Sequence, residues 1–164
     1  MKYLLLLSLL VIFVACDTKK DKTKIEKSEN TENPFYKEWN TKFEIPPFNE
    51  IKDEHYMPAF KKGMEDNLAE IDAIVNNPED PTFTNTIEEL EISGELLDKV
   101  SSVFYNLAGS NTNPKLQELQ RELSPMLSAH SDKINLNEGL FNRVDAIWKV
   151  REDLDLTNEQ LKLL

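Results

Sequence analysis

The side chains that most often carry chemistry are sparse in this sequence. It contains two histidines, His55 and His130, and a single cysteine, Cys16. A structural zinc site needs about four cysteine or histidine ligands, and a disulfide needs two cysteines. The sequence also lacks the His-Glu-x-x-His, Gly-x-Gly-x-x-Gly, P-loop and Gly-x-Ser-x-Gly motifs. We therefore expect no catalytic, cofactor-binding or metal-binding residue in these 164 residues.

The remaining candidate side chains have explanations that need no catalysis. His130 continues an apolar stripe, so we expect it to be partly buried with its hydrogen bonds satisfied. His55 stands near a helix start, where we expect it to bond within the first turn. Several acidic residues fall mostly off the apolar stripes, and we expect them on solvated faces rather than in a catalytic pair. They are Glu65, Asp66, Glu88, Glu89 and Glu91.

Aromatic residues gather between positions 35 and 48 and are a second candidate for binding. They could hold a ligand, but packing of this proline-rich segment onto the helices explains them more simply. Pro46 and Pro47 exclude helix there and favour an extended segment on the surface. The aromatic residues are Phe35, Tyr36, Trp39, Phe43 and Phe48.

The composition predicts a globular, all-α chain. Hydrophobic residues make up 40% of the sequence and charged residues 30%, with only four glycines. The formal net charge is −11, and residues 34–164 contain 13 basic and 25 acidic side chains. Because binding to nucleic acid requires a basic face, we expect no nucleic-acid partner.

Residues 1–15 have the pattern of an export signal. Lys2 precedes an apolar run from Leu4 to Ala15, which is shorter than the roughly 20 residues that span a bilayer. Cys16 follows directly, as in bacterial lipoprotein signals, although Phe13 stands where that pattern usually has an aliphatic residue. We predict lipid attachment at Cys16; the alternative is an ordinary secretory signal with an incidental cysteine. The chain is then expected to be exported and anchored to a bacterial membrane, in the periplasm or cell envelope.

Residues 16–33 predict a flexible, lipid-anchored tether. After Cys16 the segment contains five lysines, five acidic residues and one large apolar residue, Ile25. Such a segment buries too little surface to offset the entropy of ordering it. Residues 34–164 are expected to form a helical domain.

Apolar residues at steps of three and four predict the helices of that domain. The first begins at Asp53 as its cap and ends before Asn76-Asn77-Pro78. The second starts at Thr84 or Thr86, with Thr86 and Glu89 at capping-box spacing. Gly94 lies in the middle of its stripe, where we expect a close helix crossing.

The later helices are predicted from their caps. Asn113 precedes Pro114 at the start of the third helix, which Pro125 should kink or break. Asn137 begins a fourth helix, and Thr157 begins a fifth with Gln160 at capping-box spacing. Since this last helix has a start but no stop signal, we expect the chain to be truncated.

The sequence from Asn33 to Leu164 also resembles a known family. The motifs fall in one order with no large gap. They are Asn33-Pro34-Phe35, Pro46-Pro47-Phe48, Ile51 to Phe60, Asn77-Pro78, Pro81-Thr82-Phe83, Asn85-Thr86-Ile87, Ser93-Gly94, Asn111-Thr112-Asn113, Pro125-x-Leu127-x-x-His130, Leu136-Asn137, Leu140-Phe141, Arg143-Val144 and Leu156-Thr157. Together they resemble the amino-terminal region of bacterial peptidyl-dipeptidases and oligopeptidases of the thimet oligopeptidase family, with the peptidyl-dipeptidase branch closest.

The resemblance implies a fold and an activity for the parent enzyme. Members are two-lobed, almost wholly helical zinc peptidases with a deep channel that admits short peptides. This chain would correspond to the first part of the amino-terminal helical lobe. The zinc ligands of the family lie far toward the carboxyl end, so the resemblance transfers no catalytic or metal residue to this sequence, and His130 matches a structural position.

Three hypotheses follow for the function. The first is an amino-terminal fragment of a membrane-anchored zinc peptidyl-dipeptidase, inactive alone, whose parent hydrolyses short peptides. The second is a short helical lipoprotein that acts as a non-catalytic binding module. The third is a separately translated half that joins a catalytic chain.

Overall fold

A computed structural model describes residues 33–164. The predicted signal (residues 1–15), Cys16 and the tether up to residue 32 lie outside the described residues. Within residues 33–164 all regular elements are helices, which confirms the all-α class. The α-helices are α2 (Asp53–Val75), α3 (Glu89–Ile92), α4 (Glu95–Ser110), α5 (Pro114–Asn135), α6 (Glu138–Val150) and α7 (Asn158–Leu163), joined by a π-helix (Phe83–Glu88) and by the 3-10 turns Pro34–Tyr36, Lys42–Glu44 and Arg151–Asp153.

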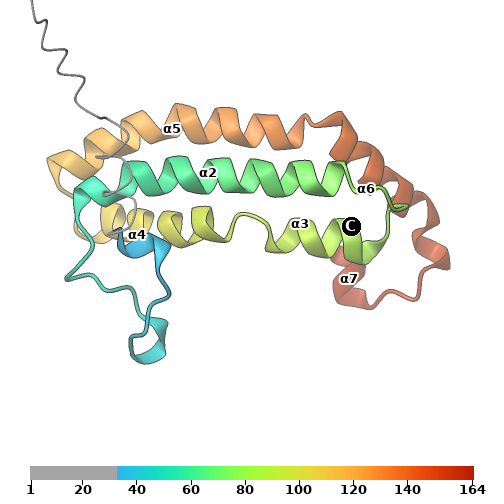
Figure 1. Ribbon diagram of the computed structural model, residues 1–164, viewed down its shortest axis with the longest axis horizontal. Coiled ribbons are helices and arrows are strands. Elements are labelled where there is room, and N and C mark those ends of the chain that lie inside the picture. The colour runs from blue at the N-terminus through green and yellow to red at the C-terminus, as the bar shows by residue number, and fades with distance from the viewer. Residues whose placement is uncertain (1–32) are drawn as a thin grey trace, which may run out of the picture.

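Helix α2 lies in the middle of the bundle, between α4 and α5 (Figure 1). Helix α4 runs alongside α2 in the opposite direction (Figure 1). The chain then turns again, so that α5 runs in the same direction as α2 (Figure 1). Helices α6 and α7 lie at the end where α2 finishes. Residues 37–52, which we call the strap, project beyond the helices at the opposite end (Figure 1).

The buried apolar side chains form one large core and two small ones. The large core lies at the start of α2, and the small cores lie near its end, against α6 and the π-helix. One small core joins the end of α2 to α6, and the other joins the π-helix to α6. The large core contains Phe35, Tyr56, Ala59, Phe60, Met64, Val100, Val103, Phe104, Leu116, Leu119 and Leu123; the small cores contain Ile71, Ile74 and Leu140, and Phe83, Ile87 and Ile147.

Gly63 is the point of closest approach between α2 and α4. A β-carbon at this position would lie 2.9 Å from both the Cα and the backbone N of Leu97. Only a residue without a side chain therefore fits at this crossing.

Three predicted helix caps are confirmed. The side-chain oxygen of Asn113 accepts a bond from Leu116 N at 2.9 Å, and that of Asn137 accepts from Leu140 N at 3.0 Å. Thr157 and Gln160 form the reciprocal capping box, at 3.2 and 2.9 Å.

Two predicted helix starts are wrong by a few residues. Asp53 is the first residue of α2 rather than its cap, because the cap position is Lys52. The capping box before the π-helix consists of Thr82 and Asn85, at 2.8 and 3.0 Å, instead of Thr86 and Glu89. Thr86 is instead fully buried, with an exposed fraction of 0%.

The single helix predicted across Gly94 is also wrong. The helical path ends at Ile92 and restarts at Glu95, because Gly94 adopts a left-handed backbone with φ of 84°. The close helix crossing expected at Gly94 lies at Gly63 instead; at Gly94 a β-carbon would meet a side chain, at 3.1 Å from Asn67 Nδ2.

Of the predicted kink or break at Pro125, the break is wrong. The helix runs continuously from Pro114 to Asn135. Because proline has no backbone N–H, Pro125 leaves the carbonyl of Arg121 without its helical hydrogen-bond donor. Both residues are exposed, so water can bond to that carbonyl. No helix in the described part of the chain is long and apolar enough to span a membrane.

Candidate functional site

His55 occupies the structural position predicted for it. Its Nδ1 accepts a hydrogen bond from Lys52 N at 3.1 Å, which satisfies a backbone donor at the start of α2. The predicted role within the first turn is confirmed.

Two buried polar side chains and one half-buried polar side chain, from three segments, meet in the middle of the bundle. His130 of α5 is 7% exposed, and its Nε2 lies 2.8 Å from Asn67 Oδ1 of α2. Asn67 Nδ2 donates to Ser93 Oγ at 3.2 Å, and Ser93 Oγ donates to Leu90 O at 2.8 Å. We call Asn67, Ser93 and His130 the polar layer. It lies beside the break between α3 and α4.

The hydrogen bonds of the polar layer fix the protonation of His130. Since Asn67 donates through Nδ2 to Ser93, its Oδ1 accepts, and Nε2 of His130 carries the proton. Nδ1 is buried and has no hydrogen-bond partner in residues 33–164. The predicted burial is confirmed, but the prediction of satisfied hydrogen bonds is wrong for Nδ1. Burial, with a smaller effect of Lys133, lowers the pKa of His130.

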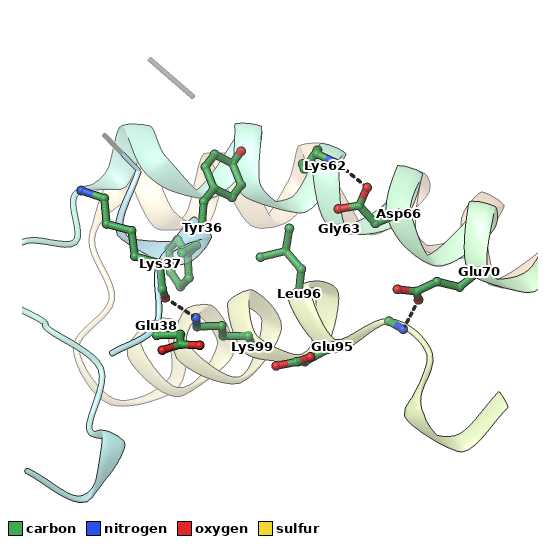
Figure 2. A pocket seen from close by; sticks show the side chains of 12 residues that line it. Tyr36, Lys37, Glu38, Lys62, Gly63, Asp66, Glu70, Glu95, Leu96 and Lys99 are labelled. Atoms are coloured by element: carbon green, nitrogen blue, oxygen red, sulfur yellow. Dashed lines mark hydrogen bonds and ion pairs between the residues drawn. The ribbon is translucent and has the colours of Figure 1, made fainter. Parts of the chain in front are cut away.

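A groove of about 530 Å³ opens beside the polar layer, between α2, α4 and the Pro34–Tyr36 turn (Figure 2). Lys62 and Asp66 form an ion pair along α2. One turn further on, Glu70 Oε2 accepts a bond from Gly94 N at 2.7 Å and so holds the break (Figure 2). The groove is lined by Phe35, Tyr36, Lys37, Glu38, Lys62, Gly63, Asp66, Glu70, Gly94, Glu95, Leu96 and Lys99.

Lys99 closes the strap end of this groove. Its Nζ donates to Lys37 O at 2.7 Å and lies 4.4 Å from the centre of the Trp39 ring. Burial lowers the pKa of Lys99, although Glu95 and Glu38 oppose this effect. The buried Tyr36 hydroxyl finds no partner among the described residues, and burial together with Asp66 raises its pKa. The groove therefore combines paired charges with one buried phenol.

Of the five carboxylates predicted on solvated faces, three are confirmed as exposed. Glu65, Glu89 and Glu91 are exposed, Glu88 is half-buried, and the half-buried Asp66 is paired with Lys62. Of the aromatic residues, Phe35, Tyr36 and Trp39 pack against the large core as expected. The same expectation is wrong for Phe43 and Phe48, which are 81% and 47% exposed.

Arg143 joins α6 to the turn that precedes the π-helix. It is 8% exposed, and it donates to Asn77 O at 3.1 Å, Glu79 O at 3.2 Å and Thr86 Oγ1 at 3.2 Å. A fourth bond goes to Asn85 Oδ1 at 3.0 Å. The guanidinium thus fixes a turn by bonding backbone and neutral oxygens.

The zinc that the resemblance implies does not fit the described residues. No group of three His, Cys, Asp or Glu side chains in residues 33–164 is placed to hold a metal ion. We therefore derive no chemical step through zinc for this part of the chain. Its side chains can bind and position, through the groove and the polar layer.

Sequence reasoning missed Asn67, Ser93 and Glu70 as members of this site. Asn67 carried a usable signal, because it lies three residues after Met64 and four before Ile71, in phase with buried positions. Ser93 and Glu70 carried none, since their roles depend on a helix break that the local pattern does not show.

Comparison with known proteins gives three informative relatives. Dipeptidyl carboxypeptidase of Salmonella typhimurium (strain LT2) is 46% identical over 132 residues, which is 80% of this chain and 19% of the relative. Dipeptidyl carboxypeptidase of Escherichia coli (strain K12) is 45% identical over 134 residues, or 82% of this chain and 20% of the relative. Oligopeptidase A of Salmonella typhimurium is 30% identical over 102 residues, or 62% of this chain and 15% of the relative. No protein-family model matches the chain.

The matches cover a large share of this chain but a small share of each relative. They cover most of this chain, whereas the chain spans about a fifth of the length of the dipeptidyl carboxypeptidases. The described helices therefore correspond to a limited part of such a protein.

Proposed function

Because the chain belongs to the thimet oligopeptidase family of peptidases, whose dipeptidyl carboxypeptidases it matches over four fifths of its length, we propose that it forms part of the helical lobe of a peptidyl-dipeptidase. The parent enzyme would release dipeptides from the carboxyl ends of short peptides. The observation that supports this branch is the higher identity to dipeptidyl carboxypeptidase, 46%, than to oligopeptidase A, 30%.

In this proposal the chain contributes structure and no catalytic residue. The parent enzyme would use zinc to activate water for attack on the peptide carbonyl, with ligands outside this chain. Within residues 33–164, the α2–α4 contact and the polar layer set the shape of the lobe, and the groove beside them supplies charged groups at its surface.

We also propose that the parent enzyme is exported and held at a bacterial membrane through Cys16. The support is the apolar run that ends immediately before the only cysteine. The charged residues after Cys16 would then hold the helical lobe away from the lipid surface. Peptides in the periplasm or cell envelope would be the substrates.

A chimera tests the proposed function. In Escherichia coli dipeptidyl carboxypeptidase, the matched segment is replaced by residues 33–164 of this chain. We expect the chimera to fold and to release dipeptides from the carboxyl end of a short amino-blocked peptide, detected by mass spectrometry. The isolated chain should release none under the same conditions.

A second chimera is the control that shows whether activity requires the sequence of residues 33–164. It receives an unrelated helical segment of the same length and should be inactive. If the chimera with residues 33–164 is equally inactive although the unmodified enzyme works, the proposal fails. The short helical lipoprotein would then be the better hypothesis.

A further inference from the structure

The tip of the strap exposes an unusual amount of apolar surface. Phe43, Ile45 and Phe48 are 81%, 50% and 47% exposed, all within six positions of one projecting loop (Figure 1). Single exposed apolar side chains are common, but three together on a protruding segment mark a surface that another part is expected to cover.

The backbone of the tip is also held in an unfavourable conformation. Phe43 has φ of 63° and ψ of 23°, and Glu44 has φ of 55°. Residues with a side chain rarely adopt this left-handed region, and an aromatic residue gains nothing there by itself. Backbone strain of this kind persists where surrounding contacts require it.

Local contacts keep the tip pointing outward. Thr41 Oγ1 donates to Ile45 O at 2.6 Å, and Glu44 N donates to Thr41 O at 3.1 Å. The base of the strap is fixed by the bond from Lys99 to Lys37 O, and Pro46 and Pro47 stiffen the return path. The exposed side chains are therefore presented by a fixed loop.

The charge distribution indicates what the tip can meet. The strap carries three lysines and three glutamates, whereas residues 53–164 carry 10 basic and 22 acidic side chains. Because the strap has no net charge, its tip can meet an apolar surface without an electrostatic cost, whereas the acidic body would repel a second copy of the chain or an anionic lipid surface that came close to it.

We propose that Phe43, Ile45 and Phe48 dock into an apolar pocket on the part of the parent peptidase that lies beyond this chain. This inference rests on the proposed function. It is supported by length, because the matched relatives are about five times as long as the matched segment, so that most of such a protein lies outside this segment and can supply a surface for the tip. The strap then joins the lobe to the remainder of the enzyme.

Hydrogen exchange on the active chimera tests this docking. In the isolated chain, the backbone amides of residues 41–45 and of Phe48 should exchange quickly, and in the chimera they should exchange at least about tenfold more slowly. Phe43→Asn removes the ring while keeping a residue that tolerates left-handed backbone, so it should fold normally and restore fast exchange in the chimera.

A control variant separates docking from general loss of apolar surface. Leu136 is also 81% exposed but lies outside the strap. Leu136→Asn should leave exchange of the strap unchanged. Two results with an active chimera would overturn the docking and leave the proposed function intact. One is a strap that is not protected from exchange, and the other is protection that Phe43→Asn does not alter.

Two further outcomes would also overturn the docking. One is dimerisation of the isolated chain that Phe43→Asn abolishes, measured by sedimentation. The other is binding of the isolated chain to vesicles of phosphatidylethanolamine and phosphatidylglycerol that Phe43→Asn abolishes. A different outcome would support the docking and count against the proposed function. In that outcome the chimera is inactive, its strap is protected from exchange, and Phe43→Asn removes the protection.

Discussion

At the scale of single residues, two buried polar side chains show different ways of avoiding a desolvation cost. Arg143 directs four hydrogen bonds to oxygens of the turn before the π-helix and of the π-helix itself. His130 remains neutral and uses only Nε2, which leaves Nδ1 buried without a partner in the described residues. Because an added proton would place a charge at that site, His130 makes the stability of the fold depend on pH.

The pKa of His130 predicts that stability falls in acid. Burial lowers this pKa in the folded chain below the value near 6.5 of the unfolded chain. As the pH falls below about 6.5, the unfolded chain therefore binds a proton that the folded chain does not, and the free energy of unfolding decreases by at most about 1.4 kcal/mol per pH unit. Above that pH this contribution is constant. Denaturant unfolding between pH 5 and pH 8 measures it.

The variant His130→Gln isolates this effect. Glutamine can donate to Asn67 Oδ1 but does not titrate. The difference in stability between the original chain and His130→Gln should depend on pH, with the original chain losing more as the pH falls from 6.5. An identical pH dependence in both chains would assign the acid sensitivity to carboxylates instead.

At the scale of elements, the break between α3 and α4 depends on contacts with α2, although the sequence there continues a helical pattern. The apolar positions continue in helical phase across Ser93 and Gly94, but Glu70 and Asn67 of α2 bond to the backbone and side chain at the break. Gly94 provides the left-handed conformation that this geometry requires.

Alanine substitution at two glycines tests the requirement for a break. Gly94→Ala must place a β-carbon at φ of 84° and 3.1 Å from Asn67 Nδ2, so the chain should lose about 1–2 kcal/mol of stability. Gly109→Ala is the matched control, because a β-carbon there meets nothing within 4 Å in the described part of the chain. It should stabilise α4 by roughly 0.5–1 kcal/mol.

Thermal and denaturant unfolding of both variants measure the difference. Equal effects of the two substitutions would show that Gly94 has no special backbone role. A stabilised Gly94→Ala chain would favour the continuous helix that the sequence predicts.

The sequence predicted helix ends better than helix interruptions. Asn113, Asn137 and Thr157 cap their helices through residues only three positions away, so the signal is local. The break at Gly94 depends on Glu70, which lies 24 positions earlier. Burial of Asn67 and His130 can be predicted from their phase with apolar positions, but their pairing in the polar layer cannot, since they are 63 positions apart.

At the scale of the whole molecule, the proposed anchor and the acidic helical body have separate roles. Residues 34–164 contain 13 basic and 25 acidic side chains, so a bacterial membrane with anionic lipids would repel them. Attachment should therefore depend on lipid at Cys16 and hardly on the folded part.

Substitution of the cysteine tests this dependence. In bacterial cells supplied with labelled palmitate, the original chain should carry label and sediment with membranes. Cys16→Ser should lose essentially all label and move to the soluble fraction. In the double variant Cys16→Ser with Ser28→Cys, a displaced cysteine should not restore labelling. Label that persists in Cys16→Ser would exclude attachment at this residue.

The central position of α2 also affects how the chain can fold while it is being made. Helix α2 ends at Val75, but its second neighbour, α5, is complete only at Asn135, sixty residues later. At synthesis rates of about 5–20 residues per second, the α2 surface that meets α5 waits for roughly 3–12 seconds without its neighbour. A nascent chain of this kind offers an apolar helix to chaperones during that interval. A core that closes late would also suit the export that we propose, because passage through an export channel requires an unfolded chain.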